Sequence, residues 1–405
     1  MAAIVCCQCL KGNMRTFKSL LKEEADESKL KHITHVEDHA IHDGPEGFNH
    51  ATGVLNQVRK HIKAGKKDAT LTMKHDGSPS IVYGHHPENG KFFVASKSAF
   101  NVTPKINYTE KDIETNHGHA PGLVAKLKDA LHHLPKAAPK SGVFQGDMMF
   151  GHGDKTEHDG KVHFKPNTIN YSAPKDSEEG KKIRKAKMGV YTHTQYHGNT
   201  ISDMKADFNP DLSGFKSHSD VYHREPGHDA SKVMMTKHDE EQFQHHLASA
   251  QALHDLHGKQ MYPATEPHRN AAGPVEAHIN QTVRTSEKPS VNGLKKSIET
   301  KYDKDVSKMK TPAAIARKEA EKKAHVDHID SNAQHYENFF KMHHHLQKAK
   351  DALVHVLSRH TGGLEHSVGD ASVKPEGFVA THKGKVSKLN DRQEFNRLNF
   401  LARPR

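Results

Sequence analysis

Strand-like and helical patterns follow one another along this chain in long blocks, and their order constrains the fold more than any other feature. Residues 69–100 show three strand patterns, and Asn89-Gly90 between two apolar runs is typical of a β-hairpin turn. Strand patterns continue in 142–172 and resume from residue 373, whereas helical patterns fill much of the sequence between them. This order predicts an α+β protein with a mostly antiparallel sheet core, N-terminal helices and a large helical insertion.

The blocks divide the chain into consecutive segments. We expect an N-terminal helical segment at 1–65, a first part of the core at 66–214, a helical insertion at 215–365 and a second part of the core at 366–405. Lengthening a loop costs only about 0.6 kcal/mol per doubling of its length, so the two parts of the core can still meet in space.

Local signals refine the predicted insertion. Thr311-Pro312 is a favourable N-cap followed by a proline at the first helical position, so a helix should begin there. A second long helical pattern follows at 332–359, and Gly362-Gly363 ends it. Residues 258–292 contain several glycines and prolines, which predict a loop.

Composition limits the partners of the chain. The formal net charge is +11, which favours a polyanion such as nucleic acid. Cys6, Cys7 and Cys9 are its three cysteines, and this usage fits a reducing cytoplasm better than an oxidising compartment. No apolar stretch approaches the roughly 20 residues that a membrane-spanning helix needs, so we expect no membrane partner. Oligomeric state is left open.

Lys74 is the strongest candidate for chemistry. It stands between two apolar stretches, and Asp76 and Gly77 follow it closely. A lysine partly buried beside a turn can act as an amine nucleophile when its ammonium loses a proton. Taken alone, Lys74-His75-Asp76-Gly77 is more often a surface turn, so the rest of the sequence must decide.

Further short motifs follow Lys74 in a fixed order. They are Ser96-Lys97-Ser98, the strand pattern around Asp147, the strand pattern around Tyr191, Glu376-Gly377-Phe378-Val379, and the pair Lys385 and Lys388. In this order the motifs resemble those of covalent nucleotidyltransferases, the superfamily of ATP-dependent DNA and RNA ligases and mRNA capping enzymes. The Lys74 motif continues with Ser78 and is followed by Ser-Lys-Ser, which is more similar to phage-type RNA ligases than to DNA ligases.

The resemblance implies a fold and a role for each motif residue. The fold is a nucleotidyltransferase domain of ATP-grasp-like ligase architecture. The sequence departs from the family in having no evident C-terminal OB-type domain, which weakens the ligase interpretation. Lys74 corresponds to the nucleophile, and Lys388 to a catalytic lysine at the α-phosphate of ATP. The residues implied in nucleotide binding are Asp76, Gly77, Lys97, Tyr191, which stacks on the purine, and Lys385. Asp147 and Glu376 correspond to ligands of Mg²⁺ or Mn²⁺.

The implied function is an ATP-dependent polynucleotide ligase that forms a lysyl-AMP on Lys74, with RNA favoured over DNA. We expect such a ligase to be located in the cytoplasm. If the protein is encoded by a tailed phage, this is the cytoplasm of the infected host cell. Three positions depart from the family pattern: Pro79 replaces a frequent arginine, Asp147 replaces glutamate, and Thr192 replaces an acid. These departures favour the alternative, a non-catalytic nucleic-acid-binding or structural phage protein built on a ligase-like domain.

Overall fold

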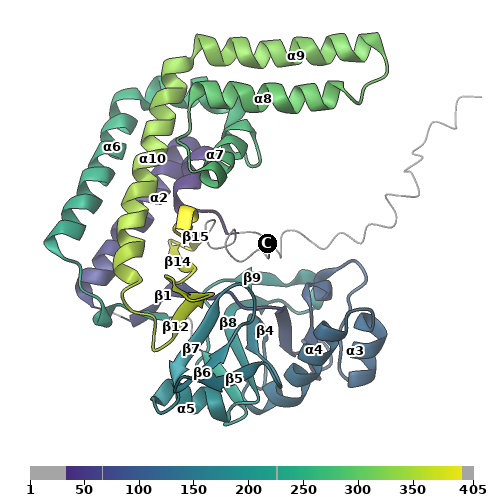
Figure 1. Ribbon diagram of the computed structural model, residues 1–405. Helices are drawn as coiled ribbons and strands as arrows, with labels where there is room; N and C mark the ends of the chain where they lie inside the picture. The colour runs from purple at the N-terminus through teal and green to yellow at the C-terminus, as the bar shows by residue number, and fades with distance from the viewer. Residues whose placement is uncertain (1–32, 66, 225–226, 395–405) are drawn as a thin grey trace, which may run out of the picture.

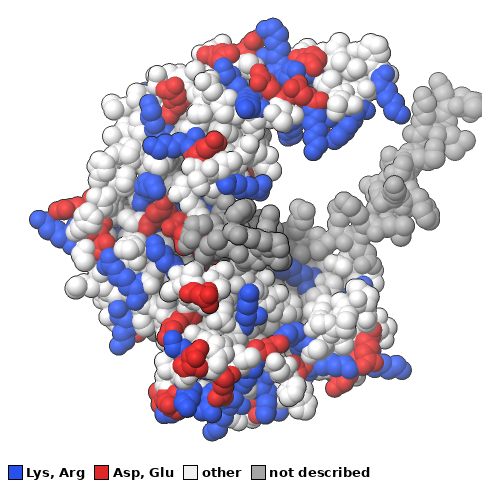
Figure 2. Space-filling model, in the orientation of Figure 1, with Lys and Arg blue, Asp and Glu red and all other residues white. Residues whose placement is uncertain are grey.

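A helical half and a sheet-rich half face each other across a hollow in this protein (Figures 1 and 2). The structure is a computed structural model, and it describes residues 33–65, 67–224 and 227–394. The three cysteines and the first part of the predicted N-terminal helical segment lie outside the described residues. The described part is a mixed α/β fold, as predicted in outline.

Long helices that share one apolar core form the helical half. Its elements are η1 (Val36–Asp38), α1 (His39–His42), α2 (Gly44–Ala64), α6 (Lys237–Thr265), η6 (Glu266–His268), α7 (Pro274–Thr285), α8 (Val291–Val306), α9 (Pro312–Ser331) and α10 (Ala333–Leu357). Leu55 of α2, Phe243 of α6 and Phe339 of α10 are fully buried in this core. Phe378 and Leu389, from the second strand-rich stretch of the sequence, are buried in the same core. The predicted N-terminal and inserted helices are therefore one packed unit with part of a sheet.

The strands of the described residues form three sheets. The first sheet has the order β11 (Gly227–Asp229), β1 (Lys67–Lys74), β14 (Gly377–His382), β15 (Lys385–Leu389). The second has the order β10 (Val221–Arg224), β8 (Met188–His197), β4 (Val143–Phe150), β2 (Ser80–His85), β3 (Phe92–Ala95), with β9 (Lys205–Asp207) also paired to β8. The third has the order β13 (Ala371–Ser372), β12 (Glu365–Val368), β7 (Asn170–Pro174), β6 (Lys161–Phe164), β5 (Lys155–His158). Neighbouring strands are antiparallel, apart from the parallel pair β10 and β8.

Short helices cover the outside of the sheet-rich half. They are η2 (Lys97–Phe100), α3 (Glu110–His117), α4 (Pro121–His133), η3 (Leu134–Lys136), α5 (Glu178–Lys185) and η4 (Ile201–Asp203). η5 (Ala230–Lys232) follows β11 and packs against α2 instead. Leu127 and Ala130 of α4 are fully buried against Ile81 and Val94 of the second sheet. That packing leaves the opposite face of the second sheet to meet the first sheet.

Several predicted elements are confirmed. β2 and β3 form the predicted hairpin, and Gly90 in its turn has a φ of 69°, which a glycine adopts without strain. Helix α9 begins at Pro312, and the side chain of Thr311 accepts a hydrogen bond from the backbone N–H of Ala314. α10 matches the predicted helix at 332–359 closely.

Two predictions about the insertion are wrong. Residues 258–292 are not a loop, because α6 continues through Pro263 to Thr265, η6 follows it directly, and α7 occupies Pro274–Thr285. Met261 and Tyr262 are buried there, and their burial outweighs the helix-breaking tendency of the proline. The helices also begin later than residue 215, since β10 and β11 lie after that point and extend two of the sheets.

A buried ionic network joins the two halves of the sequence. Lys350 of α10 donates to Glu37 over 2.8 Å, and both side chains are completely buried. Arg392, just after β15, donates to Asp38 over 3.0 Å. Burial opposes the ionisation of Glu37, but Lys350 and Arg392 outweigh it and lower the pKa of this carboxyl. The network fixes the segment after β15 to η1 and α10.

None of the described helices is long and apolar enough to cross a membrane.

Candidate functional site

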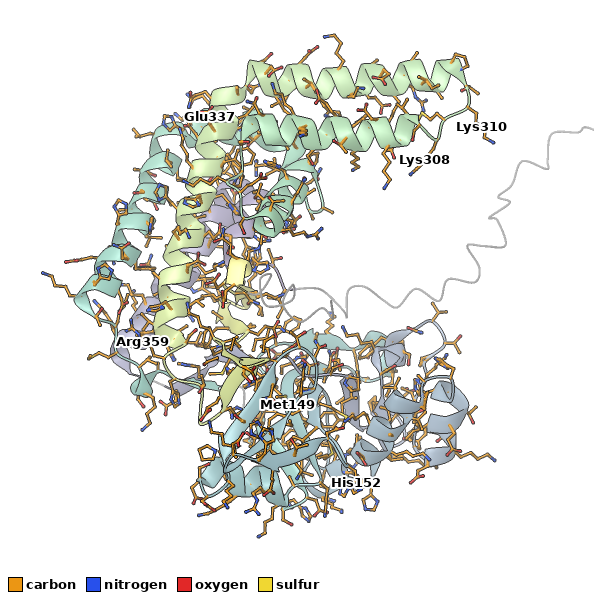
Figure 3. The ribbon with its side chains drawn as sticks, in the orientation of Figure 1. Met149, His152, Lys308, Lys310, Glu337 and Arg359 are labelled. Carbon is orange, nitrogen blue, oxygen red and sulfur yellow. The ribbon has the colours of Figure 1, made fainter. Side chains whose placement is uncertain are left out.

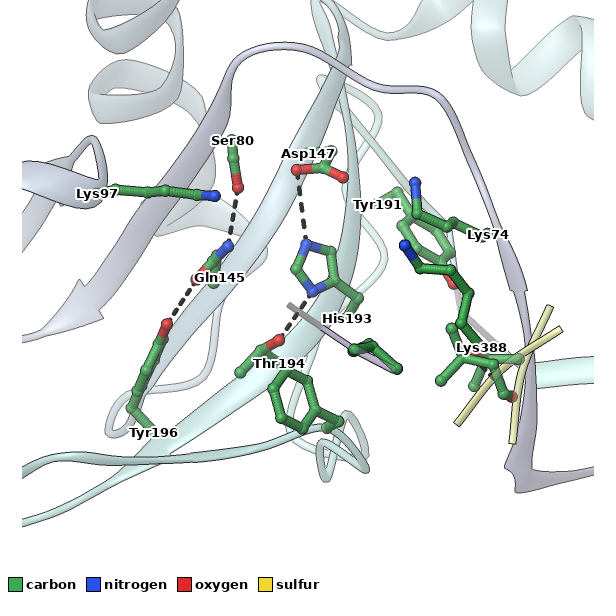
Figure 4. A pocket seen from close by; sticks show the side chains of 14 residues that line it. Lys74, Ser80, Lys97, Gln145, Asp147, Tyr191, His193, Thr194, Tyr196 and Lys388 are labelled. Atoms are coloured by element: carbon green, nitrogen blue, oxygen red, sulfur yellow. Dashed lines mark hydrogen bonds and ion pairs between the residues drawn. The ribbon is translucent and has the colours of Figure 1, made fainter. Parts of the chain in front are cut away.

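A cavity of about 310 Å³ lies between the first and second sheets (Figure 4). Its volume is at the lower end of the range of small-molecule sites, roughly 300–1,000 Å³. The lining side chains are Ile33, Thr72, Lys74, Ser80, Lys97, Gln145, Asp147, Tyr191, His193, Thr194, Tyr196, Phe208, Val379 and Lys388. Five of the motif residues of the sequence, Lys74, Lys97, Asp147, Tyr191 and Lys388, are therefore in one place.

Strand register aligns the residues of the first wall. Thr72 of β1 lies opposite Val379 of β14, which in turn lies opposite Lys388 of β15. Side chains two positions apart on a strand share a face, so Lys74 lies on the same face as Thr72. The four side chains form a continuous wall although they come from both ends of the described chain.

The second wall comes from β2, β4 and β8. Ser80 lies opposite Asp147, and Asp147 lies opposite Tyr191 in the second sheet. The hydroxyl of Tyr191 is buried and donates to the backbone carbonyl of Met73, so the tyrosine also ties β8 to β1. Burial raises the pKa of this phenol, which therefore stays neutral.

Lys74 is held by a buried carboxylate. Its Nζ lies 2.5 Å from each oxygen of Glu376, which directly precedes Gly377, the β14 partner of Lys74. Burial raises the pKa of Glu376, and the attraction of Lys74 only partly offsets this effect. Glu376 thus favours its protonated form more than an exposed glutamate does.

Lys388 brings a second amine to Lys74. In Figure 4 the amines of the two lysines point to the same part of the cavity. Burial, followed by the positive charge of Lys74, lowers the pKa of Lys388. No ion pair of Lys388 is seen within the described parts of the chain, so its charge is available to an anion in the cavity.

Asp147 of β4 faces His193 of the neighbouring strand β8, on the same wall of the cavity. The Nε2 of His193 lies 3.5 Å from Oδ1 of Asp147. Burial alone would raise the pKa of Asp147, but His193, Lys74 and Ser80 outweigh burial and hold that pKa below its usual range. Asp147 thus favours its ionised form at neutral pH.

A chain of hydrogen bonds organises the other end of the cavity. The Tyr196 hydroxyl donates to Oε1 of Gln145 over 2.5 Å, and Nε2 of Gln145 donates to the Ser80 hydroxyl over 2.9 Å. Lys97 is exposed at the start of η2, and its amine points toward this chain (Figure 4). This end of the cavity therefore offers a positive charge beside neutral polar groups.

Asp76 and Gly77 do not line the cavity. Asp76 accepts hydrogen bonds from the side chain of Asn167 and the backbone N–H groups of Thr168 and Ile169, at 2.8 to 3.1 Å. These bonds fix the turn after Lys74 against the loop before β7. Gly77 lies so close to β4 that a Cβ atom there would be 2.6 Å from the Cβ of Asp147.

Lys385 also lies outside the cavity. Its amine donates to Asp43 over 2.6 Å in an exposed ion pair. Lys385 and Lys388 are separated by an odd number of positions on β15, so they project from opposite faces of the strand. Lys385 is therefore not among the residues that line the cavity.

The residues that could hold a divalent cation are few. Within the described parts of the chain, no group of three or more His, Cys, Asp or Glu side chains is arranged to hold a metal ion. Mg²⁺ is commonly bound by one or two carboxylates together with the phosphates of a substrate. Asp147 fits that arrangement, whereas both oxygens of Glu376 contact Lys74 and must leave it before they can bind a metal.

A family model described as a family of unknown function, DUF6267, matches residues 30–403. The chain belongs to this family. No curated protein and no solved structure matches it. The matched residues include both strand-rich parts of the sequence and the helices between them. The two walls of the cavity and the helical half are therefore covered by a single family model.

Sequence reasoning missed several cavity residues. His193 lies two positions after Tyr191 on β8, and Gln145 lies two positions before Asp147 on β4. The alternation of side chains along a strand was a sufficient signal for both, because their predicted neighbours face the cavity. No sequence pattern marked Phe208, which follows β9 in irregular structure.

Gly77→Ala is expected to lower covalent labelling by ATP and to destabilise the protein by about 1–3 kcal/mol, a typical cost of overpacking. Its Cβ would meet Asp147 at 2.6 Å and the carbonyl of Met148 at 3.0 Å, so Asp147 must move. Gly122→Ala is the matched control, because nothing lies within 4 Å of its Cβ position. Urea unfolding and the labelling assay measure the two effects, and equal behaviour of the two variants would contradict the close packing.

Proposed function

We propose that this protein is an ATP-dependent nucleotidyltransferase that adenylates Lys74 and passes the AMP to the 5′-phosphate of a polynucleotide. The observation that carries the proposal is the meeting of Lys74, Lys388, Lys97, Asp147 and Tyr191 around one cavity. These residues come from five separate stretches of the sequence. If Lys74-His75-Asp76-Gly77 were only a surface turn, there would be no reason for the other four motif residues to lie beside it.

The first step forms a nitrogen–phosphorus bond. The uncharged Nζ of Lys74 attacks the α-phosphorus of ATP, the bond to the oxygen that bridges to the β-phosphate breaks, and pyrophosphate leaves with that electron pair. The ammonium proton of Lys74 must leave before the attack. Glu376 is the nearest acceptor at 2.5 Å, and its raised pKa suits it to take that proton.

Lys388 and Lys97 supply positive charge to the phosphates. Phosphoryl transfer depends mainly on positioning and on neutralising the charge that develops on oxygen. Lys388 lies beside Lys74, where the α-phosphate must sit, and Lys97 lies at the other end of the cavity. Tyr191 and Val379 provide flat and apolar surface for a purine between the two walls.

A bound Mg²⁺ would neutralise part of the negative charge of the phosphates. Asp147, ionised and on the cavity wall, is the residue of this chain best placed to hold it. In covalent nucleotidyltransferases, which the motif order resembles, the position that Asp147 matches usually carries glutamate, and an aspartate provides the same hard oxygen ligand with a shorter reach.

Two further steps transfer the AMP to the 5′-phosphate and join the two ends. An oxygen of the 5′-phosphate attacks the phosphorus of lysyl-AMP, the nitrogen–phosphorus bond breaks and Nζ of Lys74 regains a proton. The 3′-hydroxyl of a second end then attacks the activated 5′-phosphorus and releases AMP, with its proton passing to solvent. RNA is the favoured substrate, as the resemblance to phage-type RNA ligases suggests.

Incubation of the protein with ATP labelled at the α-phosphate, followed by denaturing electrophoresis, tests the proposal. We expect label that stays with the protein, is lost in acid and survives alkali, as a phosphoramidate does. The same assay with labelled GTP determines the nucleotide. If neither nucleotide labels the protein with Mg²⁺ or Mn²⁺, the non-catalytic nucleic-acid-binding function takes its place.

A further inference from the structure

Helices α8 and α9 form a hairpin that projects from the body over the hollow (Figures 1 and 2). We call this hairpin, residues 291–331, the arm. At about 1.5 Å of rise per residue, its helices of 16 and 20 residues are roughly 24 and 30 Å long. Few residues of the arm are fully buried, so most of it lies outside the core of the helical half.

The arm is held together along its length. Leu294 and Ile298 of α8 are buried with Ile329 of α9 at its base. Farther out, Lys318 of α9 lies 4.5 Å from the ring centroid of Tyr302 of α8. Ion pairs cross between the helices, Lys295 with Asp330 at 2.6 Å and Lys322 with Asp303 at 2.8 Å. These contacts make the arm a firm support rather than a loose loop.

A second set of lysines remains on the arm without partners. Lys301, Lys304 and Lys308 are exposed, and none of them forms an ion pair with any described residue. Lys301 and Lys304 are three residues apart, which places them on one side of α8, where Cβ atoms are about 5–6 Å apart. That side differs from the one that Asp303 and Lys295 use to reach α9. Lys308 lies two residues beyond the end of α8 at Val306.

These lysines border the hollow. α8 is the helix of the arm that lies nearer to the sheets (Figure 1), and positive side chains line its lower edge in Figure 2. Lys308 projects into the hollow from the end of α8, and Lys310 lies at the tip of the arm (Figure 3). β15, which carries the cavity residue Lys388, borders the same hollow (Figure 1).

We propose that the arm binds the phosphodiester backbone of the nucleic-acid strand whose end occupies the cavity. The inference rests on the proposed function and adds a location for the strand. A row of unpaired lysines can neutralise successive phosphates with release of their counterions. An acidic protein fits this side of α8 less well, because the uncharged residues beside the lysines, Ser297 and Thr300, are small and polar, and protein interfaces are depleted in lysine. Asp305 also lies near these lysines, and they outnumber it.

The test uses three sets of substitutions in the full chain. The first is Lys301→Gln with Lys304→Gln and Lys308→Gln, and the second replaces the same lysines with arginine. The matched control is Lys181→Gln with Lys182→Gln and Lys185→Gln, which removes the same charge from exposed positions on α5. α5 lies at the far end of the sheet-rich half, away from the hollow (Figure 1).

Fluorescence anisotropy with a 5′-phosphorylated single-stranded RNA, and with DNA of the same sequence, gives the affinity at several salt concentrations. The glutamine arm variant should bind at least about tenfold more weakly at low salt than the unaltered protein. Its log–log salt slope should fall by about 2, since each lost phosphate contact removes about 0.7 for a single strand. The arginine variant and the α5 control should bind within about twofold of the unaltered protein, and RNA and DNA should respond alike.

Two readouts separate this inference from the proposed function. Labelling by ATP should be unchanged in all three variants, because the arm does not line the cavity. If the arm and α5 substitutions weaken nucleic-acid binding equally, or if neither weakens it, the arm is not the binding surface. Such a result does not affect the labelling of Lys74. Arm-dependent binding by a protein that takes no label supports the arm and overturns the proposed function instead. The inference would also be overturned if the protein bound an acidic protein in the absence of RNA and the glutamine arm variant lost that binding.

Discussion

Lys74→Ala is expected to abolish covalent labelling by ATP while leaving the fold intact. The variant removes the only amine proposed to form the nitrogen–phosphorus bond, so no residual label should remain above background. Lys74→Arg should fail as well, because a guanidinium stays protonated and is a poor nucleophile. Lys388→Ala should reduce the rate of labelling by about 10²–10³, the usual cost of losing a charge that acts in the transition state.

Lys385→Ala is the matched control for these variants. It removes a lysine from the same strand as Lys388, but Lys385 lies outside the cavity and pairs with Asp43. Its labelling should match that of the unaltered protein, and circular dichroism should show the same melting behaviour for all four variants. Label that persists in Lys74→Ala would show that another residue accepts the nucleotide. Loss of label in Lys385→Ala would contradict the assignment of the cavity to the opposite face of β15.

Acid is expected to unfold this protein earlier than it unfolds an ordinary domain. Burial lowers the pKa of His366 to about 3 and those of His39 and His268 to about 4, all from an ordinary value of 6.5. The folded pKa lies below the unfolded one, so the unfolded chain binds more protons once the pH falls below about 6.5. The free energy of unfolding then decreases by up to about 1.4 kcal/mol per pH unit for each such histidine.

The three histidines together should remove several kcal/mol of stability by pH 5, a large share of the roughly 5–15 kcal/mol of a typical protein. Glu37 adds to this loss below about pH 4.5, because its pKa is lowered in the folded state and its ion pair with Lys350 is lost as it protonates. Urea unfolding at fixed ionic strength between pH 8 and pH 5 measures the effect. Stability should be flat from pH 8 to 7 and then fall steadily.

His366→Leu isolates one of these groups. Neither ring nitrogen of His366 has a hydrogen-bond partner among the described residues, so an apolar side chain of similar size loses no bond there. The variant should show a shallower fall in stability below pH 6.5 than the unaltered protein. His238→Gln is the control, because His238 is exposed and should leave the slope unchanged. Parallel pH curves for His366→Leu and the unaltered protein would contradict the buried neutral state of this ring.

Local sequence signals predicted those parts of the fold that local interactions decide. The Asn89-Gly90 hairpin and the Thr311 cap each depend on a few adjacent residues, and both are present. Pro263 misled because it sits inside α6, where burial of Met261 and Tyr262 by distant helices decides the structure. β10 and β11 were missed because they are only four and three residues long and are defined by their partners in the sheets.

Some residues of the candidate site could likewise be predicted from the sequence, and others could not. The order of the motifs selected Lys74, Lys97, Asp147, Tyr191 and Lys388, which the fold brings to one cavity. Lys385 could have been set aside from the sequence, since an odd spacing from Lys388 on a strand puts the two on opposite faces. The pairing of Glu376 with Lys74 could not have been predicted, because it depends on the register between two strands far apart in the chain.

The separation of β1 from β14 has a consequence for synthesis of the protein. Lys74 and Glu376 lie 302 positions apart. The residues of β1 from Leu71 to Lys74 pair with β14. At about 5–20 residues per second, a ribosome needs on the order of 15–60 s to make the intervening chain. During that interval the backbone groups of β1 that later pair with β14 have no partner strand, and such an edge can associate with other chains. The protein should therefore depend on chaperones while it is being made, and a chain cut short before residue 377 should aggregate rather than accumulate as a folded fragment.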